Sequence, residues 1–95
     1  MGSGVEQWRG LVAAHFAPGD VNRALCLMQH ESGGNPNAKN PRSTASGLFQ
    51  ILRFWWADEF GLDPFVPEHN VYMASRIKDQ QGWSAWSPYN RGLCR

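Results

Sequence analysis

The segment that most constrains the fold covers residues 20–32 and combines helical periodicity with an acid at its end. Its apolar residues recur three or four positions apart: Val21, Ala24, Leu25 and Met28. This spacing predicts a helix with one buried face and with Asp20 as its N-cap. Glu31 follows Met28 by three residues and therefore lies on the buried face. Because an ionised carboxylate is costly to desolvate, an acid in this position indicates a paired or chemically active group.

Two glycines after this segment predict where the helix ends. Gly33 and Gly34 can adopt the left-handed backbone conformation that commonly terminates helices. We therefore expect Glu31 in the last helical turn, at the edge of a cleft formed by the following loop. Residues 33–46 are rich in Gly, Asn, Pro and Ser and lack apolar periodicity, which predicts a loop with at most a short hairpin-like turn.

The apolar pattern predicts three further helices, each followed by glycine or proline. The first covers about residues 5–16, and the last covers residues 68–80. Between them, a helix that allows a break is predicted over residues 46–60, with an inner face formed by Leu48, Ile51, Leu52, Trp55 and Phe60. Residues 83–89 are aromatic and interrupted by proline, too short for an independent element, and are expected to lie against the domain. The whole pattern predicts a mainly α, small single-domain protein.

Three short motifs occur in a fixed order along the chain: ESGGNPNA at 31–38, GLFQI at 47–51 and PEHNV at 67–71. Together they resemble the SLT-type lytic transglycosylases of the lysozyme-like group, including compact phage and actinobacterial muramidase domains, over roughly residues 21–86. The resemblance implies a lysozyme-like fold in which the loop after Glu31 forms the rim of a substrate groove. It also implies cleavage of peptidoglycan glycan strands between N-acetylmuramic acid and N-acetylglucosamine.

Length and composition agree with one domain of ordinary globular character. We interpret residues 1–4 (MGSG) as a cloning remnant and residues 5–95 as the lysozyme-like catalytic domain. A net charge of +1 with scattered basic residues argues against nucleic-acid binding, and no apolar run is long enough to cross a bilayer. No secretory signal is recognisable. We expect a monomer that acts on peptidoglycan outside the cell or as part of a phage particle.

Glycosidic cleavage requires an acid that is protonated near neutral pH, and desolvation by apolar neighbours provides one. Glu31 is the candidate for general acid and then general base. In the alternative interpretation, the Asn35 side chain or loop amides merely hold this carboxylate at the helix end. No second carboxylate lies in a recognisable motif among Glu6, Asp20, Asp58, Glu59, Asp63, Glu68 and Asp79. The resemblance implies that one Glu suffices, with the substrate's acetamide stabilising the cation and the muramyl 6-hydroxyl closing an anhydro ring; hydrolysis by water remains the alternative outcome.

Six further residues are candidates for substrate binding. Gln50 is expected to face the groove and contact an N-acetyl group, or alternatively to tie down its own loop. Ser46 is a candidate donor to the acetamide carbonyl. Asn70 matches the family's PxxN segment, although an Asn near a helix start is equally a capping residue. The aromatic candidates for contact with sugar rings are Trp83, Trp86 and Tyr89.

The two cysteines, Cys26 and Cys94, are interpreted either as a disulfide that pins the C-terminal tail onto the central helix or as buried thiols, with the disulfide slightly favoured. Two cysteines without suitably spaced histidines do not predict a metal site, and neither a metal nor an organic cofactor is expected. Two rival functions remain: a glycan-binding module without activity and a structural domain of a phage particle.

Overall fold

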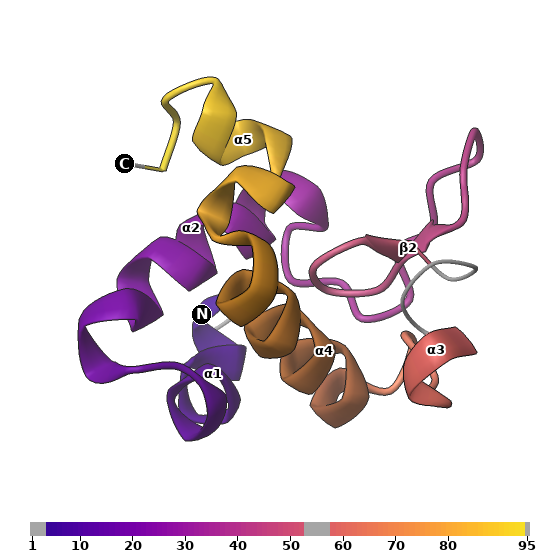
Figure 1. Ribbon diagram of the computed structural model, residues 1–95, viewed down its shortest axis with the longest axis horizontal. Coiled ribbons are helices and arrows are strands. Elements are labelled where there is room, and N and C mark those ends of the chain that lie inside the picture. The colour runs from indigo at the N-terminus through magenta and orange to yellow at the C-terminus, as the bar shows by residue number, and fades with distance from the viewer. Residues whose placement is uncertain (1–3, 53–57, 95) are drawn as a thin grey trace.

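Two helices, α2 (Val21–Glu31) and α4 (Pro67–Gln81), form the centre of the domain (Figure 1). The computed structural model describes residues 4–52 and 58–94. A 3-10 turn (Glu6–Trp8) leads into α1 (Arg9–His15), which packs against both central helices. A second 3-10 turn (Pro18–Asp20) enters α2. The mainly helical, lysozyme-like fold predicted from the sequence is confirmed.

The buried faces of the central helices follow the apolar pattern. In α2 the residues Val21, Ala24, Leu25 and Met28 are buried, and in α4 the residues Val71, Ala74 and Ile77 are buried. These faces form one core together with Val12, Phe16, Leu48 and Phe49. The core holds α2 in place, and Glu31 is the last residue of that helix.

The helix predicted over residues 46–60 is wrong for its first part, residues 46–52. Ala45–Ser46 forms strand β1, which pairs antiparallel with β2 (Ile51–Leu52), and the hairpin lies beside α4 on the side away from α1 (Figure 1). The residues between the strands cannot be helical because Gly47 and Gln50 have φ angles of +80° and +52°. Leu52, predicted to be inward, is 43% exposed.

Beyond the hairpin, the described end of the predicted helix, Asp58–Phe60, is helical. Trp55 belongs to residues 53–57, outside the described part of the chain. The short helix α3 (Asp58–Phe60) follows, and the chain then turns at Gly61, whose φ angle is +69°. Phe60 packs against the core as predicted.

The C-terminal segment forms more regular structure than the sequence predicted. A 3-10 turn (Trp83–Ala85) precedes the short helix α5 (Ser87–Asn90), which packs against α2. Trp86 between them is buried, and its indole N–H donates a hydrogen bond to the carbonyl of Phe49 at 3.1 Å. As predicted, the segment lies against the domain.

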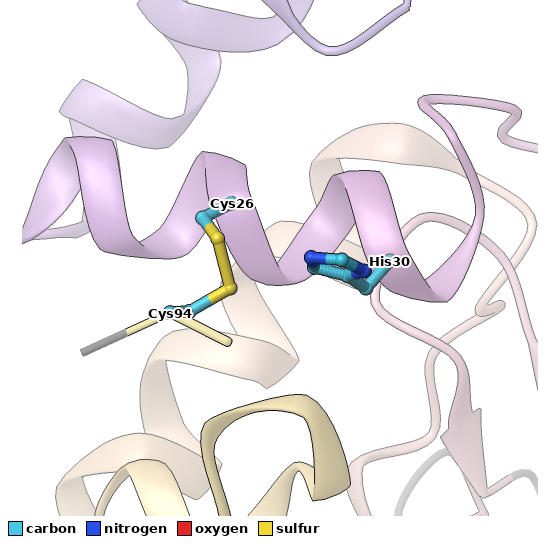
Figure 2. Close-up of side chains that lie close together, drawn as sticks. All are labelled: Cys26, His30 and Cys94. Atoms are coloured by element: carbon cyan, nitrogen blue, oxygen red, sulfur yellow. A yellow bond between two sulfur atoms is a disulfide. The ribbon is translucent and has the colours of Figure 1, made fainter. Parts of the chain in front are cut away.

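A disulfide joins Cys26 of α2 to Cys94 near the end of the chain (Figure 2). The two residues are 68 positions apart, so the bridge closes a loop that contains all of the chain from the middle of α2 to the tail. Within residues 4–52 and 58–94, no helix has the length and apolar character needed to cross a membrane.

Candidate active site

A cavity of about 520 Å³ lies where the end of α2, the β-hairpin and the C-terminal segment meet. Its volume falls within the range typical of small-molecule sites, about 300–1,000 Å³. One wall comes from the hairpin and the loop before it, and the opposite wall comes from the end of α4 and the residues after it. The lining residues are Glu31, Asn40, Ala45, Gln50, Ile51, Leu52, Ile77, Gln81, Ala85, Trp86 and Ser87.

Glu31 lines this cavity because the helix ends immediately after it. The amides of Ser32 and Gly33 donate to the carbonyl of Met28 at 2.9 and 3.1 Å, and Gly33 and Gly34 then turn the chain with φ angles of +65° and +85°. The Ser32 hydroxyl donates to the carbonyl of Leu48 at 2.7 Å and so ties the helix end to the hairpin. The helix end that carries Glu31 is therefore hydrogen-bonded to the hairpin.

A contact from the first helical segment supports the same turn. The indole N–H of Trp8 donates to the carbonyl of Gly34 at 2.8 Å, which joins the N-terminal segment to the loop behind Glu31. The Asn35 side chain, proposed above as an alternative partner of the acid, instead accepts a hydrogen bond from the amide of Asn37 at 2.9 Å. It stabilises the loop locally.

The electrostatics of Glu31 are dominated by its partial burial. Burial raises the pKa of Glu31 to about 6, while the positive charge of Arg91 acts in the opposite direction. With this pKa about a tenth of the chains carry a protonated acid at pH 7, which is far more than for an exposed Glu. The site therefore holds a proton donor under near-neutral conditions.

Gln50 combines both roles considered for it from the sequence. It lines the cavity, and its amide nitrogen donates to the carbonyls of Ala38 and Gly47 at 3.2 and 2.9 Å. Both N–H groups are thus used to hold the loop. The side-chain oxygen is the group that this arrangement leaves for a hydrogen-bond donor in the cavity.

Asn70 and Ser46 lie behind the site and do not line the cavity. Asn70 is completely buried: its amide nitrogen donates to the carbonyls of Ser46 and Pro64 at 3.0 and 2.8 Å, and its oxygen accepts from the amide of Phe49 at 2.8 Å. These three bonds occupy the Asn70 side chain, which neither lines the cavity nor caps α4. The hydroxyl of Ser46 is also buried and donates to the carbonyl of Thr44 at 2.9 Å.

The aromatic candidates separate into one residue at the site and two outside it. Trp86 lines the cavity but is only 5% exposed, so it forms the base of the wall. Trp83 stacks on Phe16 at a centroid distance of 5.9 Å, and the Arg23 guanidinium lies 5.7 Å from the ring centroids of both Trp83 and Tyr89. These two rings anchor the C-terminal segment and do not line the cavity.

Several lining residues were not among the site residues predicted from the sequence. Leu52 places an exposed apolar side chain on the hairpin wall, and Gln81 lies opposite at the end of α4. Gln81 follows the buried Ile77 by four residues, so the helical repeat does place it on the same face. Ser87 reaches the cavity only because α5 docks against α2, which local sequence does not predict.

The described residues contain one group of three possible metal ligands, Cys26, His30 and Cys94 (Figure 2). None of the three lines the cavity that contains Glu31. The two sulfur atoms are joined in the disulfide, so the oxidised chain offers no thiolate ligand.

A mainly helical domain with a half-buried acid in a groove defines a protein of the lysozyme-like class. Residues 17–95 match the family described as the transglycosylase SLT domain, and the chain belongs to this family. It is also similar to Lysozyme 1 of Musca domestica, with 28% identity over 99 residues, covering 85% of this chain and 70% of that protein. Lysozyme E and Lysozyme D of Drosophila melanogaster are each 30% identical over 86 residues, covering 72% of this chain and 61% of theirs.

Proposed function

We propose that this chain cleaves the β-1,4 glycosidic bond between N-acetylmuramic acid and N-acetylglucosamine in peptidoglycan, with Glu31 as general acid and then general base. One observation carries the proposal: the half-buried Glu31 lines a cavity of about 520 Å³, and burial raises its pKa to about 6. The SLT family match and the names of the lysozyme relatives support the class of substrate. On this proposal the natural protein acts at the bacterial cell wall.

In the first step the protonated Glu31 donates its proton to the bridging glycosidic oxygen. The C–O bond to the muramyl C1 breaks as positive charge develops on that sugar, in an oxocarbenium-like transition state. Ionised Glu31 then removes the proton from the attacking hydroxyl and returns to its protonated form. The raised pKa suits both steps because neither form of the carboxyl group is strongly favoured near pH 6.

The composition of the cavity wall favours a mechanism with one protein carboxylate. Among the described residues that line the cavity, Glu31 is the only acid. Glycosidases that hydrolyse by two carboxylates place the second acid within about 10 Å across the scissile bond. We therefore favour attack by the muramyl 6-hydroxyl, which closes a 1,6-anhydro ring, over attack by water.

The other walls would orient the sugar. The Gln50 oxygen is placed to accept a hydrogen bond from an N-acetyl N–H or a sugar hydroxyl, and the exposed Leu52 offers an apolar surface to a ring face. Substrate contacts by Trp83, Tyr89, Asn70 and Ser46 are not part of this proposal, because none of them lines the cavity.

The test is turbidity loss of purified cell walls with three proteins: the unchanged chain, Glu31→Gln and Glu68→Gln. Glu68 is an exposed acid in the first turn of α4 and serves as the matched control. We expect Glu31→Gln to abolish lysis while the control remains active. Undiminished lysis by Glu31→Gln, or muropeptide binding without any lysis by the unchanged chain, would refute the proposal, and the second result would support a binding module.

Mass spectrometry of the released fragments tests the type of reaction. Transglycosylation yields anhydro-muramyl ends, whereas hydrolysis yields reducing ends that are one water heavier. Reducing ends alone would contradict the preference for the 6-hydroxyl and leave the assignment of Glu31 as acid intact.

A further inference from the structure

A cluster of metal-binding side chains lies on the surface of α2, outside the cavity of Glu31. Cys26 and His30 are four residues apart in the helix, so they lie on the same face one turn from each other. The C-terminal tail brings Cys94 to the same face (Figure 2). The two sulfur atoms and a ring nitrogen of His30 lie within 4.8 Å of one another.

We propose that the reduced chain binds one Zn²⁺-like divalent cation through Cys26, His30 and Cys94, with the fourth position open to water. Thiolate sulfur and imidazole nitrogen are the ligands that zinc prefers, and three protein ligands with one water form a common tetrahedral arrangement. Such a site separates its ligand atoms by about 3.8 Å, as follows from the usual metal–ligand distances. The two sulfur atoms, 2.05 Å apart in the disulfide, must therefore move apart once the S–S bond is broken.

Contacts other than the disulfide hold Cys94 against α2. The Arg23 Nε donates to the carbonyl of Cys94 at 3.0 Å. The same guanidinium lies 5.7 Å from the ring centroids of Trp83 and Tyr89, which connects the tail to the packed aromatic residues. The tail therefore has a basis for remaining in place after reduction.

A second cavity is lined by both cysteines. It has a volume of about 350 Å³ and shares no lining residue with the cavity of Glu31. Its other lining residues are Gly19, Asn22, Arg23 and Leu93. His30 is exposed beside the bridge. A small reductant and a hydrated cation can thus reach the cluster.

The chemical step requires an external dithiol or phosphine as reductant. A dithiol transfers two electrons and two protons to the Cys26–Cys94 bridge and is itself oxidised to a disulfide. A phosphine supplies the two electrons, and water supplies the two protons and the oxygen of the phosphine oxide that forms. Binding of the cation then displaces the two thiol protons, and neutral His30 supplies the third ligand. In an oxidising compartment the disulfide persists, so the metal-bound form belongs to reducing conditions.

In the experiment, Co²⁺ and Zn²⁺ are titrated into the full chain at low temperature, before and after its disulfide is reduced by a phosphine. We expect the reduced chain to bind one equivalent, with a thiolate-to-cobalt charge-transfer band and loss of two titratable thiols, and the oxidised chain to bind none. His30→Ala should weaken binding by more than about tenfold, the smallest loss typical of even a residue supporting a metal ligand. His15→Ala, at another exposed histidine, should leave the affinity unchanged.

Three results would overturn the inference. The first is a reduced chain that binds no cation, and the second is equal affinity in His30→Ala and in the unchanged chain. The third is a circular dichroism spectrum of the reduced chain with cation that shows an unfolded protein, because the site requires α2 and the tail to be folded. A native spectrum with one bound equivalent supports it.

Discussion

Replacing Asn70 by alanine tests whether this residue serves the substrate or the fold. The motif around it suggested a substrate contact, whereas the structure places its side chain completely out of solvent with three hydrogen bonds to the backbone. In Asn70→Ala the amide of Phe49 and the carbonyls of Ser46 and Pro64 lose their partner. At about 1 kcal/mol for each net hydrogen bond, the free energy of unfolding should fall by about 3 kcal/mol.

The assay is urea unfolding followed by tryptophan fluorescence, with Asn37→Ala as the control. Asn37 is exposed in the loop after Glu31, and its replacement should change the free energy of unfolding by less than about 0.5 kcal/mol. A urea midpoint near that of the unchanged chain, combined with loss of lysis, would refute the structural role of Asn70 and restore the substrate contact.

The remaining predictions concern pH, the hairpin and the disulfide. Lysis should decline as pH rises through about 6, where Glu31 loses its proton, and Arg91→Gln should move this decline to higher pH because it removes the charge that lowers the pKa of the acid. Burial raises the pKa of Glu31 above its value of 4.5 in an unfolded chain, so the folded state loses free energy of unfolding as pH rises from 4.5 through 6 and the buried acid ionises. Glu31→Gln cannot ionise and should therefore have a higher melting temperature than the unchanged chain at pH 7.5 but not at pH 4. Gly47→Ala should lower the urea midpoint markedly, because the φ angle is +80° and the added carbon would collide with a backbone carbonyl. Replacing both Cys26 and Cys94 by serine should reduce the free energy of unfolding by about 4 kcal/mol, as loop-closure entropy predicts for 68 residues, and an unchanged urea midpoint would contradict this.

The sequence predicted the helices well because their apolar faces repeat over several turns. The prediction failed in residues 45–52, where the apolar spacing fits a helix as well as a hairpin. Leu48 and Ile51 have helical spacing and are buried, but they belong to a hairpin. The hairpin depends on the backbone at Gly47, which lies too close to the carbonyl of Pro64 and the side-chain amide of Asn70 for any side chain to fit. Such a contact between distant segments leaves no trace in local periodicity.

The residues of the candidate site could likewise be predicted only where a single helix determines their position. Glu31 was found because a single helix determines both its face and its position at the helix end. The positions of the aromatic residues were harder to predict, because Trp83 and Trp86 are three positions apart and equally suited to contact a sugar. Packing of Trp83 on Phe16 and Arg23 removes it from the cavity, while Trp86 lies in the wall. Both outcomes depend on how the C-terminal segment docks.

The same docking relates the cavity at the end of α2 to the disulfide, which is attached at Cys26 in the middle of that helix. The segment that supplies Ala85, Trp86 and Ser87 to the cavity wall continues through α5 to Cys94, and α5 itself packs against α2. Arg91, which lowers the pKa of Glu31, lies on this segment between the wall and the bridge. Arg23 also holds the tail, so loss of the disulfide removes one of several attachments. Any resulting shift of the tail would change one wall of the cavity and move a positive charge relative to the acid, although the cysteines do not line that cavity. Loss of lysis in the double serine variant, at a temperature where it stays folded, should accordingly be accompanied by a displaced pH profile.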